Sequence, residues 1–203
     1  MYGSLNVLVS EHRIIESAIN RIEAECQAMK HYVPTGVRQM VGQWVHFIRT
    51  FADGMHHSKE ESILFAEMCN HGFLRDVGPI AVMLNDHEEG RNLTSQLADI
   101  AQAEGPLSDA ELYRLLAAAQ GYCQLLRSHI QEEDNVLYCM ALQRLDEAVL
   151  RKLALEFAAI DQSVNVELRQ SLVAWANGNS RDNLAGVPAR SSSQCTTGSV
   201  DLS

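Results

Sequence analysis

The stretch Phe51-Ala-Asp-Gly-Met-His-His-Ser-Lys-Glu-Glu-Ser-Ile-Leu-Phe65 places two histidines directly ahead of two glutamates. His56 lies four residues before Glu60, and His57 lies four residues before Glu61. On an α-helix, residues four apart are one turn apart on nearly the same face, so an imidazole and a carboxylate at this spacing reach the same point. The stretch therefore predicts a helix that carries metal ligands.

The same spacing recurs in Ser128-His-Ile-Gln-Glu-Glu-Asp-Asn-Val-Leu-Tyr138, where His129 lies four residues before Glu133. One such pair is weak evidence because chance supplies many, whereas two pairs on separate helices indicate a shared site. Two further segments contribute one histidine each. These are His12 in Ser-Glu-His-Arg-Ile-Ile-Glu and His87 in Asn-Asp-His-Glu-Glu-Gly-Arg.

The segments that carry these histidines are predicted helices. Apolar residues recur at helical spacing over about residues 5–30, from just after Pro34 to about 69, and over about 80–103, 109–143 and 146–175. Ser108 and Glu111 form a capping box at one junction. No stretch indicates a β-strand of useful length. Four long helices with short connections predict an all-α protein, an antiparallel up-down four-helix bundle with an additional C-terminal helix and a disordered tail.

Composition and charge limit the functions that are open to the chain. Its 203 residues, 46% of them hydrophobic, predict one bundle domain over residues 1–176 and a flexible tail over 177–203 that is rich in Ser, Gly, Asn and Thr. With 26 acidic against 16 basic residues, the protein repels nucleic acid and anionic lipid, so neither is an expected partner.

Without a long apolar run or a signal-peptide pattern, we expect no membrane span and a cytoplasmic location. The five cysteines are scattered without a CxxC pair, which predicts reduced thiols.

Helical phase divides the first motif into two pairs. At about 100° per residue, His56 and Glu60 fall on the apolar stripe, so they are predicted to face the interior. His57 falls beside Asp53 and Glu61 on a polar stripe, so it is predicted to face outward. The outer pair, His57 and Glu61, is expected to support the ligands by orienting them rather than to bind metal.

Phase makes the same division on the fourth predicted helix. His129 and Glu133 share a stripe with apolar residues, whereas Asp134 falls off it and is expected to play a supporting role. Tyr122 lies two turns before His129 on the inner face, where packing in the core is the simpler expectation and contact with the site is the alternative. Glu16, one turn beyond His12, is expected at the edge of the site rather than among the ligands.

The four inward histidines and two inward glutamates would occupy what are otherwise core positions. Buried imidazoles and carboxylates without partners are expensive, so their convergence requires either a dense hydrogen-bond network or metal. A set of nitrogen and oxygen ligands without thiolate suits iron, manganese or zinc. Two carboxylates that can bridge and four imidazoles are about what two metal ions need, and a di-iron site is the first choice.

In sequence, the motifs around residues 51–65, 86–91 and 129–138 resemble the hemerythrin-like HHE cation-binding family over about residues 5–142. The resemblance implies a four-helix bundle around two non-haem iron ions with carboxylate and oxo or hydroxo bridges. Carried over to this chain, the implied ligands are His12, His56, Glu60, His87, His129 and Glu133.

Oxygen-carrying hemerythrins have a second histidine one turn away on the third helix, and this chain has Met83 and Arg91 at the two candidate places. Four histidines with two glutamates are more similar to the family's stress-related branch, which includes repair proteins and oxygen or iron sensors. The resemblance thus implies a protein that binds or reduces oxygen, nitric oxide or hydrogen peroxide. The alternative is a helical interaction module in which a metal such as zinc is structural. Enzymatic activity and oligomeric state stay open.

Overall fold

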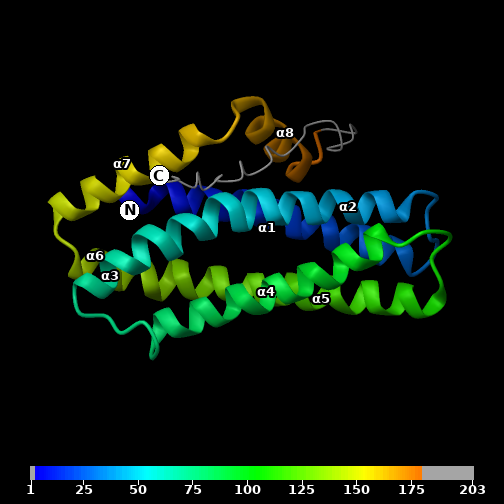
Figure 1. The fold of residues 1–203 in the computed structure, drawn as a ribbon, viewed down its shortest axis with the longest axis horizontal. Helices are drawn as coiled ribbons and strands as arrows, with labels where there is room; N and C mark the ends of the chain where they lie inside the picture. The colour runs from blue at the N-terminus through cyan, green and yellow to red at the C-terminus, as the bar shows by residue number, and fades with distance from the viewer. Residues whose placement is uncertain (1–2, 180–203) are drawn as a thin grey trace, which may run out of the picture.

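Four antiparallel helical rods make up the body of the computed structural model, which describes residues 3–179 (Figure 1). The first rod consists of η1 (Gly3–Leu5) and α1 (Asn6–Met29). The second consists of α2 (Val37–Phe47), η2 (Ile48–His57), η3 (Glu60–Leu64) and α3 (Phe65–Asn70). The third is α4 (Pro79–Gln102), and the fourth consists of α5 (Asp109–Glu132), η4 (Glu133–Leu137) and α6 (Tyr138–Arg144). The predicted all-α up-down bundle is confirmed.

The C-terminal part of the described chain forms two helices, α7 (Glu147–Ser163) and α8 (Val166–Ala176), which pack along one side of the bundle (Figure 1). The sequence pattern suggested one continuous segment over 146–175. The break occurs because Val164 and Asn165 adopt extended backbone conformations, and the Asn165 side chain accepts a hydrogen bond from the Leu168 backbone N–H at 2.9 Å. Apart from residues 177–179, the predicted tail lies outside the described residues.

The capping box predicted at the start of α5 is present. The Ser108 hydroxyl accepts a hydrogen bond from the Glu111 backbone N–H, and the Glu111 carboxylate accepts one from the Ser108 backbone N–H. The two bonds satisfy N–H groups that have no partner within the helix, which stabilises the turn into the fourth rod.

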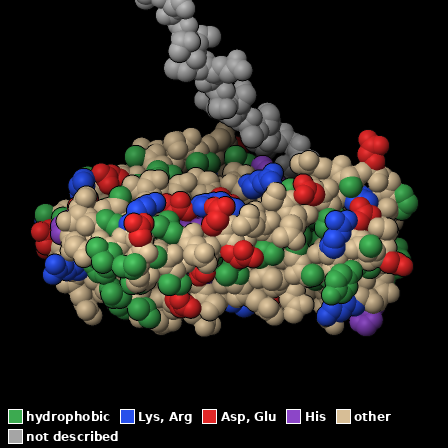
Figure 2. All heavy atoms as spheres, turned by 60° about the horizontal axis from the view of Figure 1, so that its bottom comes forward, with side chains coloured by type: hydrophobic (Ala, Val, Ile, Leu, Met, Phe, Trp, Pro, Cys, Tyr) green, Lys and Arg blue, Asp and Glu red, His purple; other side chains and the backbone are tan. Residues whose placement is uncertain are grey.

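No helix within residues 3–179 is long and apolar enough to cross a membrane. On the face shown in Figure 2, acidic and basic side chains are interspersed and neither sign forms a continuous patch.

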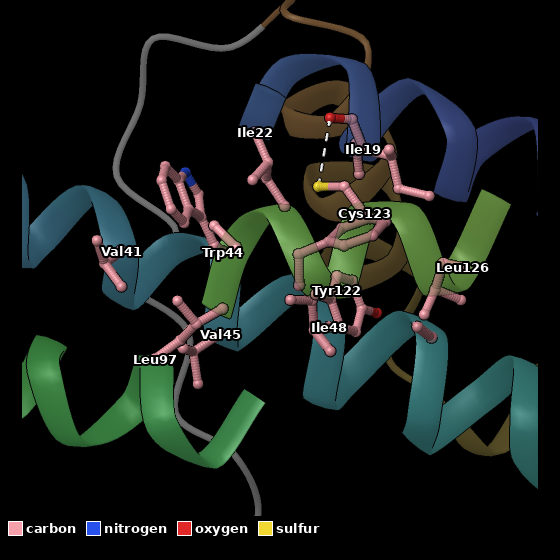
Figure 3. Close-up of a cluster of buried hydrophobic side chains, with 14 of the residues drawn as sticks. Ile19, Ile22, Val41, Trp44, Val45, Ile48, Leu97, Tyr122, Cys123 and Leu126 are labelled. Atoms are coloured by element: carbon pink, nitrogen blue, oxygen red, sulfur yellow. Dashed lines mark hydrogen bonds between the residues drawn. The ribbon is translucent and has the colours of Figure 1, made fainter. Parts of the chain in front are cut away.

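The apolar interior is divided into two clusters along the bundle. One contains Ile19, Trp44, Leu97 and Leu126 and is shown in part in Figure 3. The other, toward the opposite end, is built around residues 5–8, 64–68, 80–83 and 137–157. On every rod, the histidines singled out from the sequence lie between residues of the first cluster and residues of the second. The polar motifs therefore form a layer within an otherwise apolar core.

Two rods depart from α-helical geometry beside this layer. η2, η3 and η4 are π-helical segments, in which hydrogen bonds join residues five apart instead of four. A π turn holds more residues than an α turn, so successive side chains are rotated by a smaller angle. Face assignments made at 100° per residue therefore lose accuracy along Ile48–His57, although His56 is buried as that phase predicts.

Gly54 lies inside η2, where a Cβ atom would approach the Arg49 backbone oxygen to 3.0 Å. In an ordinary helix, replacing Gly with Ala stabilises the protein by up to about 1 kcal/mol. Gly54→Ala should instead lower the midpoint of thermal unfolding, because the new methyl group pushes against backbone that is held in the π turn.

The matched control is Gly42→Ala in α2, where an added Cβ meets no atom within 4 Å. That variant should keep or raise the unfolding midpoint. Circular dichroism melts of both metal-free variants make the comparison, and an equal gain in stability from the two substitutions would contradict the steric role of Gly54.

Candidate metal centre

Seven imidazole and carboxylate side chains from all four rods converge in the polar layer, and each is at most 3% exposed. The first rod supplies His12; the second supplies His56, His57 and Glu60; the third supplies His87; the fourth supplies His129 and Glu133. Six of them are the inward residues predicted from the sequence, and the seventh is His57.

These side chains form two overlapping groups of potential ligands. The first position is defined by His12, His56, Glu60 and Glu133, and the second by His57, Glu60, His87 and His129. Within each group, one ligand atom per residue lies within 4.8 Å of every other. Glu60 belongs to both groups, so it could contribute a carboxylate oxygen at either position.

Every imidazole of the centre turns its Nδ1 toward a carboxylate outside the two groups. The distances are 2.8 Å from His12 to Asp134, 3.2 Å from His56 to Glu11, 2.9 Å from His57 to Asp53, 2.7 Å from His87 to Glu61 and 3.4 Å from His129 to Asp86. A carboxylate only accepts hydrogen bonds, so Nδ1 carries the proton in each ring. The Nε2 lone pairs are left to point into the centre, as metal ligation requires.

The inward atoms lack the partners that buried polar atoms normally have. Nε2 of His56 and of His57, Oε2 of Glu60 and both oxygens of Glu133 have no hydrogen-bond partner among residues 3–179. Nε2 of His87 lies 3.0 Å from Nε2 of His129, and with both protons on Nδ1 these two lone pairs repel each other. Cations at the two positions would satisfy all of these atoms at once, so the residues fit a pair of metal ions.

Burial shifts the pKa values of the centre toward neutral side chains. It raises the pKa of Glu60 to about 8, against the opposing effect of the hydrogen bond that the Tyr138 hydroxyl donates, and it raises the pKa of Glu133 well above its usual value. Burial also lowers the pKa of His87 to about 3 and the pKa of His56 and His57 well below the usual value. Neutral imidazoles are the form that binds metal, whereas the carboxylates need a cation to stay ionised.

A layer of cations surrounds the outer carboxylates. Arg13 contacts Asp134, and Arg91 contacts both Glu61 and Asp53. Although burial by itself raises the pKa of Glu61, hydrogen bonds from His87 and Arg91 bring it down to about 2. Lys59 and Arg169 both contact Glu11. The five outer carboxylates outnumber these four cations, and this excess of carboxylates favours bound cations.

Comparison with known proteins agrees with this geometry. The model of the hemerythrin HHE cation binding domain matches residues 4–141, which include all seven side chains. The chain belongs to this hemerythrin HHE family. No curated protein and no solved structure matches it. The match ends before α7, so both C-terminal helices lie outside the family domain.

The position of His57 contradicts the prediction made from helical phase. It was predicted to face outward, but it is 3% exposed and its ring stacks on that of His87 with centroids 3.9 Å apart. The π-helical turn of η2 explains the error, because it brings His56 and His57 onto one inner face. His57 thus adds a fifth histidine to this HHE centre from the second rod, although Met83 and Arg91 flank His87 on the third.

The other residues of lower priority fall into two groups. Glu61 and Asp134 orient His87 and His12, as expected of supporting residues. Glu16 contacts Arg13 rather than any histidine. Tyr122 packs in the apolar cluster of Figure 3, which is the simpler of its two expected roles.

Tyr138, Glu11 and Lys59 are buried contributors that sequence analysis missed. The Tyr138 hydroxyl bonds to Glu60 and lies 3.3 Å from Nε2 of His12. Tyr138 follows Glu133 by five residues, so only knowledge of the π-helical segment η4 places the two on one face. Glu11 is the residue before His12 and Lys59 the residue before Glu60, and this adjacency was the only signal for either.

The metal-free protein should lose stability as pH rises from about 7.5 to 8.5. Glu60 has a folded pKa of about 8 against an ordinary value of 4.5, so in this interval the folded state holds a proton that the unfolded state has released. The histidine contribution has the opposite sign but is nearly complete by about pH 7.5, where the unfolded histidines have released their protons, because the histidine pKa values are lowered on folding from 6.5. Denaturant unfolding of metal-free protein at both pH values measures the change.

Glu60→Gln should reduce this pH dependence, because the variant has no proton to release at that position. Glu156→Gln, which removes a half-exposed carboxylate of α7 away from the centre, serves as the control and should keep the wild-type slope. Equal slopes for all three proteins would refute the electrostatic role of Glu60.

Proposed function

We propose that the protein holds two iron ions at this centre and that it binds or reduces a small ligand such as oxygen, nitric oxide or hydrogen peroxide, in stress response or sensing. The observation that carries the proposal is the pair of overlapping donor groups that share Glu60. When bound, iron would supply reversible electron transfer and a coordination position for a small ligand.

The donor set favours iron over softer or harder ions. It consists of five imidazoles and two carboxylates, and no cysteine among the described residues belongs to either group. Imidazole with carboxylate suits iron, manganese and zinc, whereas thiolate sites suit copper(I) and iron–sulfur clusters, and all-oxygen sites suit magnesium and calcium. Membership of the HHE family favours iron within this group.

The surrounding residues bind, orient and exclude water. The outer carboxylates hold each ring in place through Nδ1, and the Tyr138 hydroxyl holds one oxygen of Glu60. Because the seven donors are almost fully buried between two apolar clusters, bulk water is kept from them. Such an enclosure supports a ligand of two non-hydrogen atoms over a metabolite of ordinary size.

The same enclosure favours one alternative. Structural metal sites are closed, whereas catalytic sites keep an open position, and all seven donors here are buried. A helical interaction module stabilised by zinc or by redox-silent iron is therefore the second candidate. The two differ in whether the bound metal changes oxidation state and binds an exogenous ligand.

Protein loaded anaerobically with ferrous iron should hold close to two irons per chain. Exposure to oxygen, nitric oxide or peroxide should then change its near-ultraviolet and visible absorption, since ligand-to-metal transitions accompany redox change. Elemental analysis and absorption spectra test both points. A centre that holds zinc in preference to iron and gives no spectral response to any of the three ligands would favour the structural alternative.

His57→Ala should lower the iron content by about one ion per chain, because it removes one of the three imidazoles at the second position. His46→Ala is the matched control, since it removes an imidazole from the same rod that belongs to neither donor group. Retention of both irons in His57→Ala would show that this histidine is not a ligand.

A further inference from the structure

Lys59 is the most deeply buried cation of the centre, with 0% of its side chain exposed. An ammonium group removed from water in this way is stable only if it is paired with carboxylates. Its Nζ lies 2.5 Å from Oε1 of Glu11 and 2.5 Å from Oδ1 of Asp161. Glu11 belongs to α1 and Asp161 to α7, so Lys59 joins the bundle to the C-terminal helices.

Glu11 links Lys59 to His56, one of the seven side chains of the centre. Its carboxylate is 1% exposed, and its two oxygens have different partners. Oε2 accepts the Nδ1 hydrogen bond of His56 at 3.2 Å, whereas Oε1 receives Lys59 and, at 3.4 Å, Nη2 of Arg169 from α8. One oxygen therefore orients a candidate ligand while the other is held by charges that depend on α7 and α8.

The outer cations Arg13 and Arg91 do not share this dependence. Arg13 and Arg91, which contact the carboxylates beside His12, His57 and His87, are 53% and 36% exposed and belong to the four rods. Water can replace part of their effect. The Asp161–Lys59–Glu11–His56 connection is buried along most of its length, and it begins beyond the family match at residues 4–141.

We propose that Lys59 is a positioning residue through which Asp161 of α7 and Glu11 of α1 fix His56, so that the C-terminal helices set the metal affinity of the first position. The inference rests on the proposed function, because it concerns the same centre. It assigns a role to helices that the HHE domain does not include. It also predicts an asymmetry, since only the first position contains His56.

The physical argument concerns the orientation of Glu11. The Lys59 ammonium contacts two carboxylates, Glu11 and Asp161, so without the Asp161 charge only Glu11 is left of this pair. The ammonium then draws Glu11 away from the geometry in which Oε2 accepts the His56 proton. Loss of an outer partner of a ligating histidine typically weakens metal binding by about 10–100-fold.

Asp161→Asn in the full chain is the decisive variant, because it keeps the size of the side chain and removes its charge. Metal-free protein is titrated anaerobically with ferrous iron against a competing chelator. One of the two iron equivalents should weaken by up to about 10-fold, less than loss of Glu11 itself would cause, while the other is unchanged. Glu147→Gln, which removes an exposed carboxylate at the start of the same helix, should bind both equivalents as wild type does.

Two further measurements separate positioning from a merely structural role. His12→Ala and His87→Ala each remove a ligand from one position, so their Mössbauer spectra identify the iron signals of the first and the second position. Partly loaded Asp161→Asn should lack the signal of the first position and keep the signal of the second. Lys59→Arg, which keeps the charge, should retain more iron at the first position than Lys59→Met.

Equal weakening of both equivalents in Asp161→Asn, or no weakening of either, would overturn the inference and leave the proposed function standing. Wild-type protein that fails to take up two irons would overturn the proposed function and this inference with it. Circular dichroism of the metal-free variants verifies that the helical fold is unchanged before the titrations are compared.

Discussion

The burial of seven imidazole and carboxylate side chains between two apolar clusters is the constraint on which the rest of this structure depends. Imidazoles and carboxylates in such surroundings lose their hydration, and the pKa of Glu60, raised to about 8, reflects that loss. The protein compensates for this lost hydration with successive layers of polar contacts, which run from the surface to the centre. Cations hold the outer carboxylates, the carboxylates hold the imidazoles through Nδ1, and the inner lone pairs are left for metal.

This arrangement is accompanied by a departure from regular helical geometry. In the π-helical segment Ile48–His57 the backbone rotates less per residue than in an α-helix, which brings the adjacent His56 and His57 closer to one inward face. The segment η4 does the same for Glu133 and Tyr138. Such π segments often occur at functional sites, and here they increase the number of donors that one rod can present.

The C-terminal helices, which lie beyond the family domain, also contribute a charge that holds the outer part of the centre. α7 packs against η1 and η3, and it brings Asp161 to a lysine adjacent to the shared Glu60. A buried ion pair of this kind adds little to stability by itself, but breaking it is costly because an unpaired charge remains. The connection is therefore better understood as a means of orienting the centre than as a source of folding energy.

The sequence by itself determined the fold class and the family, and it predicted six of the seven side chains that the structure brings together. Helical periodicity and the four-residue spacing of His56 with Glu60 and of His129 with Glu133 are local properties, and local patterns survive in the folded chain. The break at Asn165 escaped the same reasoning because Val164 and Leu168 continue the apolar pattern through it.

Only the tertiary structure decided the role of His57, the contact of Tyr138 with Glu60 and the pairing of Lys59 with Asp161. The first two depend on π-helical turns, whose phase differs from the α-helical phase assumed in reading a sequence. The third joins residues about a hundred positions apart. Pairing of buried charges at that separation follows from how the helices pack, and no local spacing encodes it.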